Sequence, residues 1–357
     1  MTLEQRISSF ASLGQVLHAY TNSCDLKSLD PAIWETSRNL IEKAIREAEI
    51  ENPWFTCDHI LQMLLYWGNN LTDERLVDWL DPYRNGILST RDGKRIGVVM
   101  AGNIPMVGFH DLLSVLMTNH TLVARLSSQD SILIPALMNC LMLLETAWKE
   151  KVNLVTGKIS NIDAVIATGS SNTSRYFERY FGKHPNIIRK NRSGVAILTG
   201  MESQDDLEHL AKDVFIYFGL GCRSVSKLYI PKDYDFTPLN KALLTYQEFF
   251  NHVKYRNNLD YYKSLYLVNR IPFLDGGFYL LIEHEQLAAP VSVIHYEYYK
   301  DISSVTRSLT QHQDQIQCIV SLDPGVEGTI SPGSTQNPAL SDYADGVDTL
   351  RFLLEKI

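Results

Sequence analysis

Apolar residues in the first part of the chain recur three and four positions apart. Two such series are Leu40, Ile41, Ala44, Ile45 and Ile60, Met63, Leu64, Trp67. Side chains with this spacing share one face of an α-helix. A short helix beginning near Thr72 is expected to stop at Asp81-Pro82, because a residue that precedes proline avoids the helical conformation. The pattern predicts a helical N-terminal region over residues 1–85.

From residue 86 onward the pattern changes to short apolar runs separated by turns. Residues 86–91 and 95–100 flank Asp92-Gly93, a dipeptide typical of β-hairpin turns, so we predict a hairpin here. The second run is almost wholly apolar, as in a strand covered on both faces. The next predicted elements are helices at 107–117, 132–148 and 174–181 alternating with strands at 121–126, 164–168 and 194–199. This alternation indicates βαβ units and a doubly wound parallel sheet.

The remainder of the chain is mixed and less regular. The predicted helices are 205–219, 238–253, 260–266 and 347–354, and the predicted strands are 227–230, 277–282, 291–296 and 317–321. We divide the chain into three parts, with boundaries where the pattern changes. These are the helical region 1–85, a sheet domain 86–195 and a second α/β domain 196–357.

Composition and charge exclude several classes of protein. The 357 residues include 33 Lys and Arg against 41 Asp and Glu, a net charge of -8 that argues against a nucleic-acid partner. The 45% of hydrophobic residues argue against intrinsic disorder. Five cysteines, none in a CxxC pair, suggest neither a disulfide framework nor a zinc module. The ten histidines show no metal-binding spacing, so we predict no metal site.

No targeting or membrane segment is expected. Residues 1–20 lack the basic start and apolar block of a signal peptide. The most apolar window, residues 132–144, is shorter than the roughly 20 residues that span a bilayer. We therefore expect a cytoplasmic protein without a membrane span. The sequence leaves the oligomeric state open, and a homo-oligomer is one of the outcomes it allows.

The best-marked chemical candidate is Cys222. It lies between Gly219-Leu220-Gly221, which ends a predicted helix, and a strand that begins near Lys227. A thiol on such a turn is accessible and can act as a nucleophile. The glycine pair is not a dinucleotide fingerprint, since here the helix precedes the strand. The competing interpretation is that Cys222 is buried and packs as a small hydrophobic side chain, which is more common for a free cysteine.

Three further candidates follow predicted parallel strands, where open α/β sheets bind their ligands. Asn103 in Gly102-Asn103-Ile104-Pro105 carries an amide that can donate to an oxyanion. Gly169 and Ser170 belong to a small polar turn whose backbone amides can hold a phosphate. Arg125 and Ser127 offer a cation and a hydroxyl to a nucleotide ribose phosphate. The alternative interpretations are an ordinary Asn-X-Pro turn for Asn103, a strand-to-helix loop without a ligand for the Gly169 turn, and a solvated strand end for Arg125.

Together and in this order, the four segments resemble the aldehyde dehydrogenase superfamily, and within it the LuxC-like acyl-CoA reductases. The segments that carry the resemblance are residues 52–56, 71–79, 97–108, 125–128, 219–224, 289–293 and 345–346. The resemblance implies an α/β, aldehyde-dehydrogenase-like fold with a doubly wound Rossmann-type cofactor domain, an α/β catalytic domain that carries the cysteine, and the helical N-terminal region.

The resemblance also implies an activity and a role for each candidate. The activity is NADPH-dependent reduction of a fatty acyl-CoA thioester to the aldehyde through an S-acyl intermediate on Cys222, with Asn103 stabilising the oxyanion. Arg125 and Ser127 are expected on the adenosine side of the cofactor, and Gly169 and Ser170 near its pyrophosphate. The guanidinium favours NADPH over NADH, because it suits a 2′-phosphate. NADH remains the alternative cofactor.

The chain departs from the family pattern at three places. It is shorter than the luminescence enzymes, so their partner surface and long-chain preference are not carried over. Residues 188–194 lack the glutamate that serves hydrolytic aldehyde dehydrogenases as a base. A reductase does not need that base, since attack by water wastes its acyl intermediate. Gln286 stands where the family has a carboxylate for the nicotinamide ribose. This keeps an acyltransferase or thioesterase on the same scaffold open, beside a non-catalytic binding subunit with Cys222 buried.

Overall fold

The computed structural model describes residues 1–26, 28–90, 92–169 and 171–357. The chain packs into two compact units: unit 1 holds residues 1–190 and 339–357, and unit 2 holds residues 191–338. The predicted helical region thus packs in the same unit as the first sheet. The last residues of the predicted second domain also belong to unit 1.

Unit 1 is a parallel sheet covered by helices. Its helices are α1 (Leu3–Thr21), α2 (Pro31–Glu51), α3 (Cys57–Asn70), α4 (Asp73–Leu80), α5 (Arg84–Ser89), α6 (Phe109–Met117), α7 (Leu133–Leu144), α8 (Ser171–Phe181) and α13 (Thr349–Glu355). Its strands are β1 (Arg95–Val99), β2 (Thr121–Arg125), β3 (Val152–Val155), β4 (Ala164–Thr168) and β5 (Asn186–Arg189). The first helix begins with a capping box, in which Thr2 and Gln5 satisfy each other's backbone amides.

The five strands run parallel in the order β3-β2-β1-β4-β5. The chain builds outward from β1 to one side through β2 and β3, and then crosses to the other side through β4 and β5. The strand order therefore reverses at β1 and β4, and ligands of doubly wound sheets bind beyond the carboxyl ends of the strands at such a point. Strand β1 is buried along nearly its whole length, as its apolar run predicts.

The predicted hairpin at residues 86–100 is wrong in its first half. Residues 84–89 form helix α5, and Arg91 lies outside the described residues. Strand β1 already has a parallel neighbour at each edge, so no edge is left for a hairpin partner. Gly86 instead permits close packing, because a Cβ there would lie 3.2 Å from a methyl group of Leu354 in α13.

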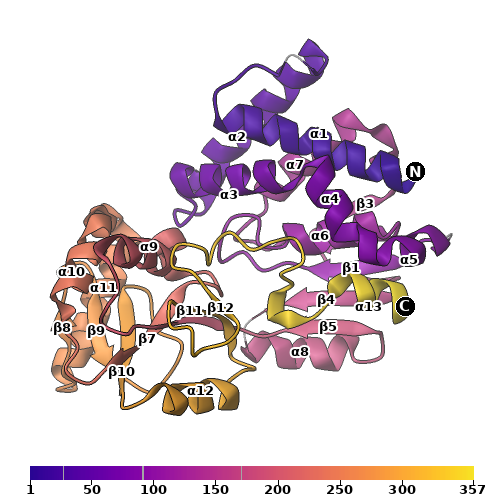
Figure 1. Ribbon diagram of the computed structural model, residues 1–357. Helices are drawn as coiled ribbons and strands as arrows, with labels where there is room; N and C mark the ends of the chain where they lie inside the picture. The colour runs from indigo at the N-terminus through magenta and orange to yellow at the C-terminus, as the bar shows by residue number, and fades with distance from the viewer. Residues whose placement is uncertain (27, 91, 170) are drawn as a thin grey trace. The chain divides into compact units, whose positions relative to one another are not determined.

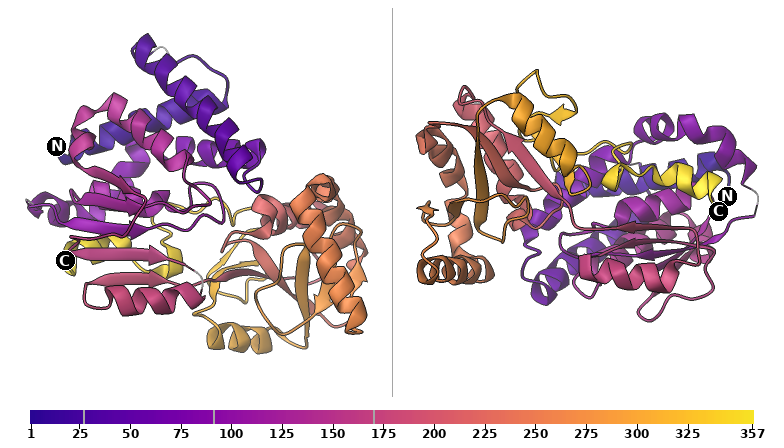
Figure 2. Two further views of the ribbon diagram at one scale, coloured as in Figure 1. Left: turned by 180° about the vertical axis from the view of Figure 1, so that it is seen from behind. Right: turned by 90° about the horizontal axis from the view of Figure 1, so that it is seen from below.

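The C-terminal segment returns to unit 1 and is fixed there by side-chain hydrogen bonds. Tyr83 donates to the carboxylate of Asp348 at 2.7 Å, and the Trp79 indole donates to the Tyr343 hydroxyl at 3.0 Å. Helix α13, yellow in Figure 1, lies beside the five-stranded sheet in that view and in both views of Figure 2. Residues far apart in the sequence thus share one core.

Unit 2 is built on a second sheet. Its helices are α9 (Gln204–Phe215), α10 (Phe236–Leu243), α11 (Val253–Val268) and α12 (Ile302–Gln311). Its strands are β6 (Ser193–Ile197), β7 (Val225–Pro231), β8 (Leu274–Asp275), β9 (Leu280–Glu283), β10 (Val293–Tyr299), β11 (Ile316–Ser321) and β12 (Thr329–Ile330). The order is β12-β11-β6-β7-β10-β9-β8, with only the short β8 antiparallel to its neighbour among the described strands.

Helices cover both faces of the second sheet. Val195 and Ile197 of β6 pack with Val305 and Leu309 of α12 in one apolar cluster. Helix α9 lies on the opposite side of the sheet, as the views in Figures 1 and 2 agree. The sequence pattern predicted β6 as a continuation of the first sheet, whereas it is a central strand of the second. The two layered α/β units confirm the predicted fold class.

Candidate functional site

The loop that carries Asn103 and the loop that carries Ser127 touch each other in unit 1. They follow the carboxyl ends of β1 and β2, which are neighbours in the sheet. A Cβ on Gly102 would lie 2.5 Å from the Ser127 hydroxyl, so this close approach requires glycine. The Met100 amide also donates to the Arg125 carbonyl at 3.0 Å. Two of the predicted segments therefore form one continuous surface, on which Asn103 and Arg125 are exposed.

Asp130 fixes the far end of the Asn103 loop. Its carboxylate accepts a hydrogen bond from the Met106 amide at 2.7 Å, and both residues are buried. Met106 has a positive φ of 55°, a conformation that costs free energy in a residue with a side chain. The buried carboxylate thus stabilises a loop conformation that the backbone alone disfavours. Asp130 is not among the residues that the sequence pattern identified.

Gly169 lies at the carboxyl end of β4, on the other side of β1. A Cβ there would lie 2.9 Å from the Phe177 ring and 3.1 Å from Thr173, so the turn packs directly onto α8. Its amide lies 3.4 Å from the Arg189 carbonyl, at the edge of hydrogen-bond distance. Ser170, the other predicted pyrophosphate residue, lies outside the described residues. Asn103, Ser127 and Gly169 thus follow three adjacent parallel strands.

Residues 188–194, where the sequence predicts no catalytic carboxylate, lead from unit 1 into unit 2. Arg189 is buried, forms an ion pair with Asp111 and donates to the Thr349 hydroxyl at 3.0 Å. Arg189 therefore serves packing, joining β5 to α6 and α13.

Three residues in the left-handed conformation precede the turn that carries Cys222. Tyr217, Phe218 and Gly219 have φ angles of 55°, 55° and 72°. Two aromatic residues in this region are strained, and such strain concentrates at functional sites. The Phe218 ring is buried and packs against Phe249 and His252, with centroids 4.6 and 4.5 Å away. Packing of the Phe218 ring therefore stabilises the left-handed backbone conformation of the residues before Cys222.

One internal hydrogen bond and contacts from three other segments fix the turn of residues 221–224. The Ser224 amide donates to the Gly221 carbonyl, and the Gly194 amide of β6 donates to the Ser224 carbonyl, both at 3.0 Å. The Cys318 thiol approaches the Arg223 carbonyl at 3.6 Å. The Gln336 amide donates to the Ser224 hydroxyl at 3.4 Å. Cys222 is half-exposed on this constrained turn, so the interpretation of Cys222 as a buried hydrophobic residue does not describe it.

Three of the other four thiols have different surroundings. Cys140 is buried in α7, and burial raises its pKa to about 11. Cys24 and Cys57 are exposed. Burial of part of its surface raises the pKa of Cys57 above the usual thiol value. These two exposed thiols serve as internal controls for any reagent that modifies Cys222.

Gln286 lies on a fixed loop between β9 and β10. The backbone carbonyl of Gln286 lies 2.9 Å from His295 Nδ1, and its backbone amide donates to His284 Nδ1 at 3.1 Å. Fully buried Lys227 adds hydrogen bonds to the His284 carbonyl and to Glu297. Burial lowers the pKa of His295 to about 4, so this ring is neutral at physiological pH. The Gln286 side chain is exposed and lines a cavity of about 370 Å³.

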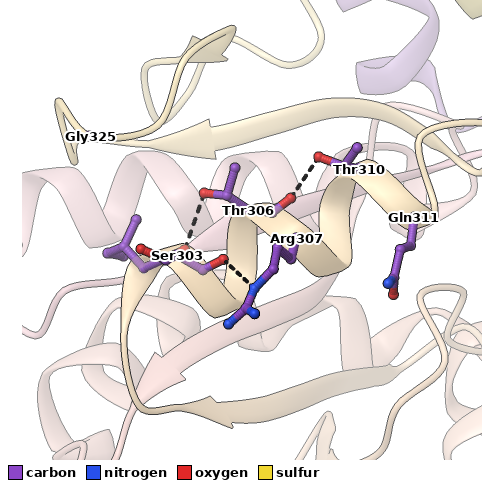
Figure 3. A pocket seen from close by; sticks show the side chains of 7 residues that line it. Ser303, Thr306, Arg307, Thr310, Gln311 and Gly325 are labelled. Carbon is purple, nitrogen blue, oxygen red and sulfur yellow. Dashed lines mark hydrogen bonds between the residues drawn. The ribbon is translucent and has the colours of Figure 1, made fainter.

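A larger hollow of about 520 Å³ lies along α12, and three of the polar side chains that line it donate hydrogen bonds to the helix itself. Figure 3 shows the hydroxyls of Thr306 and Thr310 and the guanidinium of Arg307 directed at carbonyls of their own helix.

Among the residues that the structure describes, no three His, Cys, Asp or Glu side chains are grouped as around a metal ion. Within the same ranges, no helix combines the length and hydropathy needed to cross a membrane.

Asn103 lies in unit 1 and Cys222 in unit 2, so their catalytic pairing stays a prediction, as do the roles of the cofactor residues. Sequence reasoning missed Asp130, Asp213 and Gln336 as supporting residues. Their contacts join segments that lie far apart in the sequence, and no local pattern marks them.

Three solved structures share this fold. Aldehyde dehydrogenase 21 from Physcomitrella patens is 10% identical, with 99% of this chain and 89% of that chain covered and a TM-score of 0.57. An NADP complex of glyceraldehyde-3-phosphate dehydrogenase from Methanocaldococcus jannaschii is 12% identical, with 90% and 81% covered and a TM-score of 0.55. An NAD-dependent aldehyde dehydrogenase from Sinorhizobium meliloti is 11% identical, with 95% and 76% covered and a TM-score of 0.59.

Identities this low establish the fold alone. No curated protein matches the chain in sequence. The family model described as acyl-CoA reductase (LuxC) matches residues 69–249, just over half of the chain, and this range includes every predicted site residue. The chain therefore belongs to the LuxC acyl-CoA reductase family and is an oxidoreductase.

Proposed function

We propose that this protein reduces an acyl-CoA thioester to the aldehyde, with NADPH as reductant and an S-acyl intermediate on Cys222. The observation that carries the proposal is the half-buried thiol on a turn that follows three left-handed residues and is constrained by three other segments of unit 2. Fixed geometry of this kind favours a nucleophile, because a reaction is fastest when the attacking atom is already oriented.

The proposed first step transfers the acyl group to Cys222. The thiolate sulfur attacks the thioester carbonyl carbon, the bond from that carbon to the CoA sulfur breaks, and CoA leaves as its thiolate and takes up a proton. Cys222 then carries the acyl group as a new thioester. The Asn103 side-chain amide and the Cys222 backbone amide are proposed to stabilise the oxyanion. Loss of one such donor costs about 2.7 to 4 kcal/mol, so Asn103→Ala should slow turnover about a hundredfold or more.

The loops of unit 1 fit a bound dinucleotide. Gly102 and Gly169 permit close packing where a Cβ would collide, and both lie at carboxyl ends of the strands beside the switch point. Arg125 and Ser127 would hold the adenosine end, with Gly169 and Ser170 near the pyrophosphate. When bound, NADPH would supply the hydride that reduces the acyl group. Arg125 is exposed, so its guanidinium is accessible to a 2′-phosphate.

The first experiment is mass spectrometry of the protein mixed with an acyl-CoA and no reductant. We expect an added acyl mass on a peptide that contains Cys222, and loss of that mass with release of aldehyde when NADPH is added. Cys222→Ser should abolish the adduct, whereas the matched control Cys57→Ser, which removes an exposed thiol of unit 1, should retain it.

The same experiment separates the alternatives. An acyl group released as free acid without NADPH would indicate a thioesterase, and transfer to an added thiol or amine would indicate an acyltransferase. A wild-type protein that forms no adduct on Cys222 would refute the proposed mechanism and favour a binding subunit.

A second experiment tests the cofactor. We expect a higher kcat/KM with NADPH than with NADH, and Arg125→Met should abolish the difference. Arg38→Met removes another exposed guanidinium, on α2, and should leave the preference unchanged. Equal kcat/KM values for the two cofactors in the wild-type protein would contradict the preference for NADPH.

A further inference from the structure

A segment of unit 2 that follows β12, residues 331–338, is fixed to the helix that leads to the Cys222 turn. Asp213 of α9 is fully buried and accepts three hydrogen bonds from this segment. The donors are the Gly333 amide at 2.6 Å, the Thr335 amide at 3.1 Å and the Thr335 hydroxyl at 2.7 Å. Thr335 is also fully buried. A buried carboxylate with three donors is satisfied only in this arrangement, so Asp213 determines where the segment lies on α9.

Gln336 follows Thr335 directly and reaches the turn that carries Cys222. Its Nε2 atom donates to the Ser224 hydroxyl at 3.4 Å. A Cβ on Gly221 would lie 3.7 Å from Gln336 Oε1 and 3.8 Å from Nε2. The amide head of Gln336 therefore lies against the first and last residues of the four-residue turn, and Cys222 is the second residue of that turn.

We propose that Gln336 is a positioning residue for Cys222, and that Asp213 holds the segment from which Gln336 acts. The proposal rests on the proposed role of Cys222 as the nucleophile. A neutral amide suits this place, since it contacts the turn without adding negative charge near a thiolate. A carboxylate at position 336 would lose the donor to the Ser224 hydroxyl, although it could accept from that hydroxyl, and its charge would disfavour the thiolate and raise the pKa of the thiol.

The test is the rate at which iodoacetamide alkylates Cys222 in the full chain, read by mass spectrometry of the Cys222 peptide. The rate is measured between about pH 6 and pH 10, a range that includes the usual thiol pKa of about 8.5. Gln336→Glu should raise the midpoint pH of alkylation by about 0.5 unit or more. Gln336→Ala should slow alkylation about twofold to tenfold, the range that one neutral hydrogen bond accounts for.

Gln313→Glu is the matched control, because it makes the same change of charge at an exposed position of unit 2. It should leave the midpoint within about 0.2 unit of the wild-type value, since a charge on an exposed side chain is screened by water and salt. The proposal is overturned if Gln336→Glu shows the same midpoint as Gln313→Glu. Alkylation needs neither acyl-CoA nor NADPH, so a shifted midpoint in a protein that forms no acyl adduct would support the positioning role while refuting the proposed function.

Discussion

The buried carboxyl group of Asp130 should make the stability of unit 1 depend on pH. Asp130 is 5% exposed, and burial is the main cause that raises its pKa from the usual 3.8 to about 6. Its hydrogen bond with the Met106 amide acts in the opposite direction and lowers the pKa. The charged form is therefore less stable in the folded protein than in the unfolded chain.

The direction of the pH dependence follows from proton binding. Between about pH 4 and pH 6 the folded protein holds the Asp130 proton more tightly than the unfolded chain does, so the free energy of unfolding falls as pH rises through this range. The change is complete above about pH 6 and amounts to about 3 kcal/mol, at 1.36 kcal/mol for each pKa unit. Asp130→Asn keeps a carbonyl acceptor for the Met106 amide but carries no charge, so the variant lacks this dependence.

The assay is urea unfolding followed by tryptophan fluorescence at pH 5 and pH 8. All five tryptophans, at positions 34, 54, 67, 79 and 148, belong to unit 1, so their fluorescence reports the unfolding of that unit alone. From the two pKa values, Asp130→Asn should gain about 1.4 kcal/mol of stability relative to wild type between these pH values. Asp78→Asn, a change at an exposed carboxylate of α4, is the control and should show no such gain. A gain below about 0.5 kcal/mol for Asp130→Asn would refute the reasoning.

Three further substitutions test the packing around the two sites. Gly102→Ala places a Cβ 2.5 Å from the Ser127 hydroxyl, so NADPH binding measured by calorimetry should weaken about tenfold or more, and an unchanged Kd would contradict the assigned cofactor loops. Arg189→Met leaves the buried Asp111 carboxylate without its cation, so the free energy of unfolding in the same urea assay should fall by about 3 to 5 kcal/mol. The double variant that also carries Asp111→Leu has no unpaired buried charge and should not show this loss. The Tyr255 hydroxyl is buried with no hydrogen-bond partner among the described residues, so Tyr255→Phe should stabilise unit 2 by about 1 kcal/mol, measured as resistance to proteolysis at sites within residues 191–338.

Elements with a strong local pattern were predictable from the sequence. Strand β4 (Ala164–Thr168) lies where its apolar run and the following polar turn predict it. Helix α12 was missed because its Ser and Thr residues have low helix propensity. Its apolar face consists of Val305 and Leu309. This face stabilises the helix only when it packs on β6 and β11, a contact that the local sequence does not show. Strand β5 (Asn186–Arg189) is short, and a run of this length is equally compatible with a loop.

The candidate site was predictable only in part, for a physical reason. Parallel strands bring their carboxyl ends to one edge, so the proximity of the Asn103 and Ser127 loops follows from the order of elements along the chain. The residues that hold those loops are different. Asp130 acts through the amide of Met106, and Gln336 reaches a turn more than a hundred residues earlier. Such contacts depend on tertiary packing and leave no local sequence pattern.

The conformation before Cys222 shows how side-chain packing holds a strained backbone in unit 2. A left-handed aromatic residue costs about 1 to 3 kcal/mol, and Tyr217 and Phe218 both adopt this conformation. The contacts of Phe218 with Phe249 and His252 offset part of that cost, and they are lost if the backbone relaxes to a helical conformation. Glycine in place of Phe218 would relieve the backbone strain, but it would also remove these contacts. The buried ring therefore stabilises a turn whose shape the backbone alone disfavours, and this turn presents the thiol of Cys222.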